Sequence, residues 1–327
     1  MTNIRTDLAL EAKEMYSEKH KQEKDIDGIE VINEIDKDIK VTTVKVKNES
    51  GAQKIGKPKG DYVTIEIPDF TAYDAETMDR VSQVVAEIIG RMVKIDVEKT
   101  ILVVGLGNWK VTPDALGPKV TEGIMVTRHL KTVMPEIMDD SVRPVCSIAP
   151  GVLGVTGVET VEIIKGTVER VKPDIVICID ALAARRVERV NTTIQIGDTG
   201  ISPGAGVGNN RKQINEDNLG IKVIAIGVPT VVDAVTIAND TIDIVVDSLI
   251  NNSESGSDFY KMLASLDKNE KNNLIREVLS SKALGEMIVT PKDIDLIINS
   301  LAKIISNGIN MAVQPNMDME EINKFMN

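Results

Sequence analysis

From residue 101 onward, short hydrophobic runs alternate with longer amphipathic stretches. Five runs have the length and the β-branched composition of buried strands, and they cover residues 101–105, 143–151, 173–180, 192–198 and 222–229. Helical spacing of hydrophobic residues occurs between them, over residues 118–130, 158–171 and 231–250. This alternation implies right-handed crossovers. It predicts a three-layer α/β/α fold in which helices cover both faces of a mostly parallel sheet.

The flanking regions have other patterns. Residues 1–40 are charged and weakly periodic, and "EKHKQEKDIDG" within them is predicted to be solvated. Strict alternation in "IKVTTVKVK" (39–47) and "DYVTIEIPD" (61–69) predicts two antiparallel strands, so the N-terminal part adds β-structure to the sheet. Helices are predicted at residues 76–95, 261–280 and 291–307. For the last of these, we expect Thr290 to be the N-cap and Asp293 to occupy the capping-box position.

Composition narrows the class of protein. Hydrophobic residues make up 42% of the 327 residues and aromatic residues only 2%, so the core must consist of Ile, Val, Leu, Met and Ala. The net charge of −12 predicts no general attraction for nucleic acid. There is no hydrophobic run of 18 residues and no signal-peptide pattern, so we expect a soluble, cytoplasmic protein that does not enter a membrane. Cys146 and Cys178 lie in hydrophobic runs and are expected to be buried thiols.

Two aspartates follow predicted strands. Asp114 lies in "GLGNWKVTPDALGP" (105–118), directly after the run 101–105, and Asp180 ends the run 173–180. Ligands of open α/β sheets bind at the carboxyl ends of the strands, so both side chains are candidates for one site. Two neighbouring carboxyl groups can share a proton, with one acting as general base on a water molecule and the other donating to the attacked carbonyl. Each aspartate alone is more simply explained as a turn or cap residue.

Other catalytic patterns are missing from the sequence. "GLGNWK" fails the dinucleotide fingerprint because Lys110 occupies the third glycine position, and there is no phosphate-binding loop, nucleophile elbow or H-E-x-x-H. His20 lies in the charged N-terminal region, and His129 is expected near the end of the helix 118–130, where the helix dipole favours it. Trp109 is either an exposed recognition residue or a plug over the sheet. The glycine-rich residues 197–220 either approach a bound peptide or form a mobile loop.

Several long stretches carry a resemblance. "VGLGNWKVTPDALGP", "RPVCSIAPGVLGVTGVET", "PDIVICIDALAARRVERVNTTIQIGDTGISPGAGVGN" and "IAIGVPTVVDAVT" resemble the germination protease (spore protease) family, and the similarity runs over essentially the whole chain. The resemblance implies an endopeptidase that degrades small acid-soluble, DNA-coating spore proteins in the spore core, and a homotetramer. It also implies that Asp114 and Asp180 are the catalytic aspartates, and that a single protease domain spans residues 8–327, with the core sheet region in 96–250 and a helical region in 251–327.

The resemblance also extends to the hydrogenase maturation endopeptidases, which the fold is expected to match. Their corresponding acidic residues bind metal together with a histidine. No histidine of this sequence stands in an equivalent position, so no cofactor is expected. Two alternatives stay open: a metal held by Asp114 and Asp180 with a non-histidine third ligand, and a non-catalytic peptide-binding protein that uses the glycine-rich loop.

The N-terminus resembles the family's own substrate. Thr6-Asp7-Leu8-Ala9, followed by Glu11, matches the pattern of Thr, an acidic residue, a large hydrophobic residue and Ala. We therefore expect residues 1–7 to be an inhibitory propeptide and the chain to cut itself between Asp7 and Leu8. In the simpler alternative, the stretch is the start of a helix. The stretch can be both a cleavage site and the start of a helix if its end frays and reaches the active site in an extended form.

Overall fold

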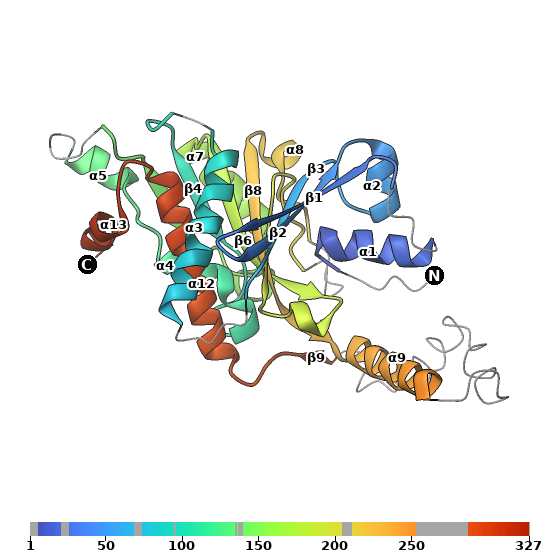
Figure 1. The fold of residues 1–327 in the computed structure, drawn as a ribbon. Coiled ribbons are helices and arrows are strands. Elements are labelled where there is room, and N and C mark those ends of the chain that lie inside the picture. Colours follow the sequence, from blue (N-terminus) through green and yellow to red (C-terminus); the bar gives the residue numbers. More distant parts are fainter. Residues whose placement is uncertain are drawn as a thin grey trace.

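The structure is a computed structural model, and it describes residues 6–20, 26–68, 74–94, 96–134, 136, 140–204, 211–252 and 287–326. Within these residues, nine strands form one sheet in the order β1-β2-β3-β7-β8-β6-β4-β5, with β9 paired to β8 (Figure 1). The strands are β1 (Ile29–Asp36), β2 (Ile39–Val46), β3 (Gly60–Glu66), β4 (Ile101–Gly105), β5 (Val145–Ile148), β6 (Ile175–Ala184), β7 (Thr193–Gly197), β8 (Lys222–Asp233) and β9 (Ile288–Val289).

The centre of the sheet is parallel. β5, β4, β6 and β8 run in the same direction, as the strand-helix alternation predicts. β7 is antiparallel to both β8 and β3, and through it the antiparallel strands β3, β2 and β1 extend the sheet on one side. The α/β class and the N-terminal β-rich addition are therefore confirmed. The predicted pairing of 39–47 with 61–69 is the ladder between β2 and β3.

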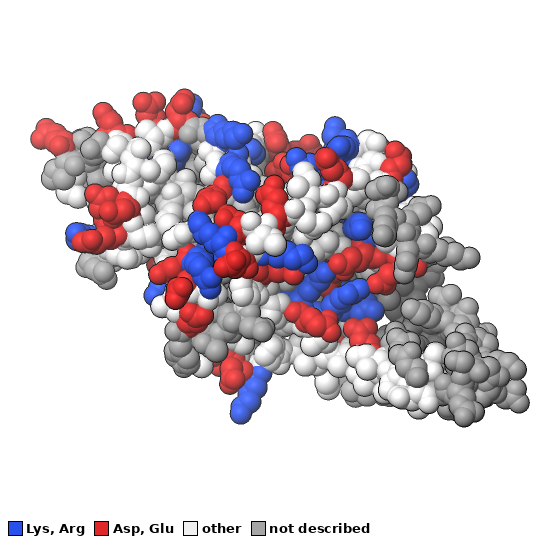
Figure 2. Space-filling view, in the orientation of Figure 1, with Lys and Arg blue, Asp and Glu red and all other residues white. Residues whose placement is uncertain are grey.

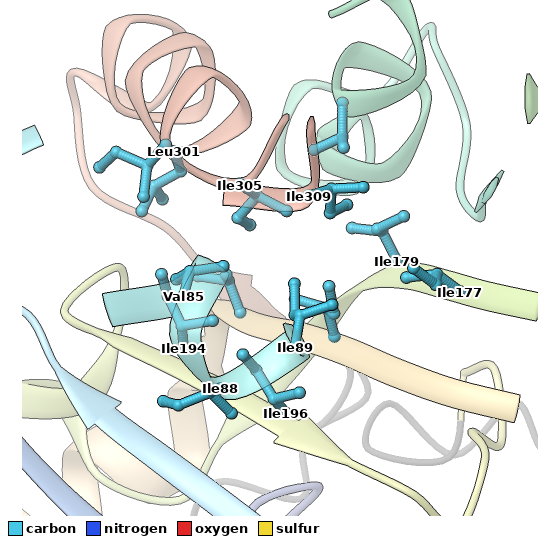
Figure 3. Close-up of a cluster of buried hydrophobic side chains, with 14 of the residues drawn as sticks. Val85, Ile88, Ile89, Ile177, Ile179, Ile194, Ile196, Leu301, Ile305 and Ile309 are labelled. Carbon is cyan, nitrogen blue, oxygen red and sulfur yellow. The ribbon is translucent and has the colours of Figure 1, made fainter. Parts of the chain in front are cut away.

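Helices cover both faces of the sheet. The described helices are α1 (Ala9–Lys19), α2 (Glu49–Ile55), α3 (Ala75–Met92), α4 (Leu116–Glu122), α5 (Arg128–Val133), α6 (Leu153–Thr156), α7 (Thr160–Val171), α8 (Glu216–Leu219), α9 (Ala234–Asn252), α12 (Ile294–Val313) and α13 (Met319–Met326). α3 and α12 lie together against one face, where side chains of β6 and β7 meet them (Figure 3). α7 packs on the opposite face. Successive residues of β6 point to opposite faces: Ile177 joins the first cluster, whereas Val176 joins the second.

α12 is long and hydrophobic enough to cross a membrane by length and composition, and it is the one described helix of this kind. Most of it is buried inside the protein, against α3 and the sheet, which is the environment of a core helix. On the face of the molecule in Figure 2, acidic and basic side chains are intermingled over the surface strands, without a broad basic patch.

The predicted helix 118–130 is instead two helices, α4 and α5, with a break at Gly123. The break is stabilised by Asn310 of α12. Its side-chain amide donates to the carbonyl of Gly123 at 2.8 Å, and its side-chain oxygen accepts from the amide of Met125 at 3.0 Å. A side chain distant in sequence thus replaces the helical hydrogen bonds, and local periodicity cannot reveal it. His129 consequently lies at the beginning of α5, so its expected place at a helix end is wrong.

Two further boundaries differ from the prediction. β8 continues to Asp233, because its last residues pair with β9, so the helix expected from Val231 begins at Ala234. The hydroxyl of Thr290 does not cap a helix but donates to the carbonyl of Thr230 at 2.9 Å. α12 begins at Ile294 and its N-cap residue is Asp293. The helix predicted at 261–280 lies outside the described residues.

Residues 1–40 contain more structure than their charge pattern predicts. α1 confirms the alternative in which the stretch after Thr6 is the start of a helix, whereas β1 was not predicted. β1 is an edge strand on which partly buried and exposed residues do not alternate strictly, and Ile35 is 79% exposed. A strand with one free edge and little burial leaves no strong periodic pattern in the sequence.

Candidate active site

The loop after β4 fixes the position of Asp114. Asp114 is the last residue of a short 3-10 helix, Thr112–Asp114. The amide of Asn108 donates both to the backbone carbonyl of Asp114, at 3.0 Å, and to its carboxylate, at 2.9 Å. Gly107 allows this approach: its φ is +119°, and an added Cβ would lie 1.9 Å from the carbonyl oxygen of Asp114. The glycines of "GLGNWK" therefore shape an aspartate-bearing loop.

Asp180 lies inside a strand. β6 continues past it to Ala184, so the expectation that the strand ends at Asp180 is wrong, and so is the alternative that Asp180 is a turn or cap residue. Its side chain is only 5% exposed, and its carboxyl oxygen accepts from the amide of Ala181 at 3.0 Å. A carboxyl group this deeply buried in a sheet is uncommon unless it has a partner or a chemical role.

The loop and the strand bring the two aspartates to one cavity. The amide of Leu106 donates to the carbonyl of Ile179 at 2.8 Å, and the hydroxyl of Thr230 on β8 donates to the carbonyl of Pro113 at 2.7 Å. The loop is thereby held over the carboxyl end of β4 and the second half of β6. A cavity of about 570 Å³ opens there, and both Asp114 and Asp180 line it. This is the position at which α/β sheets bind their ligands.

The environments of the two carboxyl groups shift both pKa values upward. Burial raises the pKa of Asp114 to about 6, against a lowering effect of the Asn108 amide. Burial raises the pKa of Asp180 well above its ordinary value, and the charges of Asp114 and Asp7 raise it further. Asp180, the more deeply buried of the two and further affected by the charge of Asp114, therefore keeps its proton more strongly than Asp114 does. Such a pair contains one base and one acid.

Residues 6–8, which precede α1 and are called the N-terminal segment below, also reach this cavity, through Asp7. The carboxylate of Asp7 accepts from the amide of Ala183 at 3.0 Å, and its own amide donates to the carbonyl of Ala183 at 3.4 Å. Asp7 thus lies along β6 just beyond Asp180. α1 begins at Ala9, so Asp7 and Leu8 precede the helix, and the backbone of Leu8 is extended. The side chains of Leu8 and Ala9 are fully buried.

Glu11, in the first turn of α1, holds the chain in place after the N-terminal segment. It is 1% exposed, and its carboxylate accepts from the amides of Arg185 and Arg186 at 2.7 and 3.0 Å. The hydroxyl of Thr6 donates to the same carboxylate, and the guanidinium of Arg189 lies 3.7 Å from it. These residues follow β6 in "ARRVER", a charged run whose role the sequence reading did not recognise.

Two further polar side chains near the segment were missed. Lys57, just after α2, donates to the backbone carbonyls of Thr6 and Asp7 at 3.2 and 2.8 Å. Gln195, in β7, donates to the carbonyl of Asp7 at 3.3 Å and accepts from the amide of Ala9 at 2.7 Å. Both come from strands and turns distant in sequence, and neither lies in a pattern with a chemical meaning of its own.

The remaining candidates lie apart from this centre or are only partly described. The ring of His20 stacks on Tyr16, with 4.1 Å between the ring centroids. Trp109 is 45% exposed in the loop after β4. Cys178 is a buried free thiol and Cys146 a partly buried one. Of the glycine-rich loop, Pro203 and Gly204 line the cavity, and residues 205–210 lie outside the described part. Among described residues, no three His, Cys, Asp or Glu are grouped so that they could hold a metal ion.

Comparison with known proteins identifies the class. The family model described as germination protease matches residues 9–255 and 246–326. A germination protease of Clostridium perfringens is 60% identical over 100% of both chains, and one of Clostridium tetani is 56% identical over 99% of this chain and 100% of its own. The germination protease of Bacillus velezensis is 45% identical over 97% of this chain and 95% of its own.

The protein is therefore a peptidase, a hydrolase of peptide bonds. The chain belongs to the germination protease family. A solved structure, the [NiFe] hydrogenase maturation protease HycI of Thermococcus kodakarensis, matches 59% of this chain and 99% of that chain with 18% identity and a TM-score of 0.28. That score is too low to carry an argument, so the fold class rests on the strand order and the helical layers of the chain itself.

Proposed function

We propose that the protein is an endopeptidase that begins the degradation of small acid-soluble, DNA-binding spore proteins during germination, with water activated by Asp114 and Asp180. The observation that carries the proposal is that both aspartates line one cavity, at the carboxyl end of β4 and the second half of β6. Membership in the germination protease family supports both the class of reaction and its timing, during germination. The substrate class follows from the resemblance, and the spore core is where such an enzyme would meet that substrate.

The two aspartates take different roles. Asp114, with a pKa of about 6, is the base that removes a proton from the attacking water. Asp180, whose pKa burial raises well above its ordinary value, supplies a proton to the reacting peptide. The different environments of the two carboxyl groups then separate the base from the acid without help from a histidine.

Single substitutions test this assignment. Asp114→Asn and Asp180→Asn should each reduce cleavage of a spore-coat protein by at least about 10²-fold, the scale of a lost acid or base. Asp174→Asn is the matched control, because Asp174 lies at the opposite end of β6 and accepts from the amide of Thr100. If both site variants retain wild-type cleavage, the paired-aspartate site is wrong.

The metal-dependent alternative needs a separate test. Complete removal of metal by a chelator, verified by metal analysis, should leave the activity of an aspartate pair intact. Loss of activity on chelation, restored by one added metal, would favour a site in which Asp114 and Asp180 are ligands.

We further propose that residues 1–7 are a propeptide and that residues 8–327 form the mature protease. Support comes from Asp7, which lies in the same cavity as the two aspartates, and from the resemblance of Thr6-Asp7-Leu8-Ala9 to the substrate. The expected cut falls between Asp7 and Leu8, and its rate should be sensitive to mild acid, because protonation changes the state of the acidic pair. N-terminal sequencing after acid incubation should yield Leu8-Ala9-Leu10. A different mature end, or processing that persists in Asp114→Asn, contradicts the proposal.

A homotetramer is the proposed assembly, from the same resemblance. Light scattering coupled to size exclusion, on the full-length chain, measures the mass directly. A monomer mass at working concentration would contradict it.

A further inference from the structure

The N-terminal segment divides two hollows. One is the cavity that contains Asp114 and Asp180, and the other, of about 940 Å³, is lined by Lys57 and Gln195. Asp7 lines both. Asp7 therefore lies between the two aspartates of the first cavity and the side chains of Lys57 and Gln195 in the second.

The contacts of Asp7 follow this division. Its carboxylate is bound by the amide of Ala183, on the strand that carries Asp180. Its backbone carbonyl oxygen accepts from the ammonium of Lys57 at 2.8 Å and from the side-chain amide of Gln195 at 3.3 Å. This oxygen belongs to the peptide bond between Asp7 and Leu8, where the proposed cut falls.

During hydrolysis of this peptide bond, its carbonyl oxygen becomes negatively charged and needs hydrogen-bond donors that stabilise the charge. When water attacks the carbonyl carbon, the new C–O bond forms and the carbonyl π electrons move onto the oxygen, which becomes negatively charged. Donors already aimed at that oxygen stabilise the charge without reorganising, and removal of one such donor costs about 10²- to 10³-fold in rate. A lysine ammonium and a neutral amide are suitable donors.

We propose that Lys57 and Gln195 form the oxyanion site of this peptidase, so that the aspartates handle protons on one side of the scissile bond while these residues stabilise charge on the other. The inference rests on the proposed function and extends it by assigning two further catalytic residues. Asp114 removes the proton from water. The tetrahedral intermediate then collapses as the C–N bond breaks, and the proton of Asp180 passes to the departing nitrogen of Leu8. The products are the carboxyl group of Asp7 and the amine of Leu8.

The surroundings of Lys57 support a fixed donor. The residue follows Gly56, whose left-handed φ of +67° ends α2, and the hydroxyl of Tyr62 donates to the carbonyl of the next residue, Pro58, at 2.9 Å. Burial lowers the pKa of Lys57, whereas the charges of Asp7 and Glu11 oppose that effect. A short, braced turn thus holds the ammonium in a partly desolvated place, where its interaction with an oxyanion is stronger than in water.

The test compares self-processing of full-length variants at Lys57 by the rate at which the Leu8 end forms, followed by intact mass. Lys57→Met should slow processing by about 10²- to 10³-fold, and Lys57→Arg, which keeps a charged donor, should retain more of the rate than Lys57→Met. Lys54→Met is the control: Lys54 lines the same hollow, but its ammonium binds the carbonyl of Asp27 and not that of Asp7, so the rate should not change. Lys57→Gln is the second loss-of-charge variant if Lys57→Met melts before the assay temperature.

A second readout separates catalysis from mere positioning of the segment. In the uncut Asp114→Asn background, hydrogen exchange of the Ala9 and Ala183 amides reports whether the segment is docked, because these amides bind Gln195 and Asp7. We expect the same protection with and without Lys57→Met. Wild-type processing in both loss-of-charge variants overturns the inference, and so does a rate loss that is matched by loss of protection.

Failure of the inference and failure of the proposed function give different results. If Asp114→Asn stops the cut at Leu8 while Lys57→Met processes normally, only the oxyanion site is wrong. If the wild-type chain never forms the Leu8 end, or Asp114→Asn forms it normally, the proposed function is wrong.

Discussion

Asp7 and Ala183 form two hydrogen bonds, in which the Ala183 amide donates to the Asp7 carboxylate at 3.0 Å and the Asp7 amide donates to the Ala183 carbonyl at 3.4 Å. The second bond joins two backbones, as in a sheet, and the first replaces a backbone acceptor with a side chain. The N-terminal segment is therefore attached to the last residues of β6, directly beyond Asp180.

A chain that begins at Leu8 should be more active than the full-length chain. Deletion of residues 1–7 removes Asp7 from the cavity and frees the Ala183 amide for a substrate. The initial rate of cleavage of a spore-coat protein by equal concentrations of the two forms is the measurement. Equal initial rates, before any self-processing of the longer chain, would remove the case for an inhibitory segment.

Gly107→Ala should reduce activity by displacing the loop that carries Asp114. The added Cβ would lie 1.9 Å from the carbonyl oxygen of Asp114, and a φ of +119° strains any residue with a side chain, so the loop that carries Asp114 must move. Displacement of a catalytic group by about 1 Å can cost about 10²-fold in rate. Gly166→Ala in α7 is the control, because nothing lies within 4 Å of its added Cβ, and it should be neutral or stabilise by up to about 1 kcal/mol. Full activity of Gly107→Ala would show that the loop can adapt.

Asp114→Asn should stabilise the fold at neutral pH and leave stability at pH 4 nearly unchanged. The folded-state pKa of Asp114, about 6, is above the ordinary value of 3.8. Between these values the folded state holds a proton that the unfolded state has released, so stability falls as pH rises through this window. The difference between the two pKa values corresponds to about 3 kcal/mol of unfolding free energy. The measured gain should be smaller, because the substitution also removes the charge-assisted hydrogen bond from the Asn108 amide. Urea denaturation at pH 4 and pH 7 measures it, and an equal effect at both values would contradict the raised pKa.

Glu11→Ala should destabilise the full-length protein by about 2–4 kcal/mol. The substitution leaves the amides of Arg185 and Arg186 without their acceptor, and it removes a buried charge beside Arg189. Glu18→Ala is the matched control on the same helix, since its ion pair with Arg186 is exposed and should contribute less than about 1 kcal/mol. Denaturation midpoints of the two variants give the comparison. Similar midpoints would mean that the buried carboxylate contributes no more than the exposed one.

The sequence predicts the parallel centre of the sheet well, because β4, β6 and β8 are buried on both faces and are nearly continuous hydrophobic runs. It also places Asp114 and Asp180 at one edge of that sheet. It does not predict that β6 continues beyond Asp180, since "ALAA" is equally compatible with a helix start. That continuation provides Ala183 as the partner of Asp7.

Contacts between distant segments explain most of what the sequence reading missed. Lys57 and Gln195 belong to an ordinary turn and an ordinary strand, and they become neighbours only because β7 lies between β3 and β8. The same applies to Asn310, which breaks the helix expected at 118–130 from a position almost 190 residues away. Local periodicity reports burial, whereas these side chains act through hydrogen bonds whose partners are set by topology.

Asp7 and Leu182 are the residues shared by the two hollows of about 570 and 940 Å³. Departure of the segment would leave the hollows open to one another across the end of β6, as a continuous trough. A trough that runs past a strand favours a polypeptide that lies extended in it over a compact domain, whose peptide bonds are held within its own fold. The shape of the joined hollows would then favour unfolded chains over folded ones, before contacts with individual side chains distinguish one sequence from another.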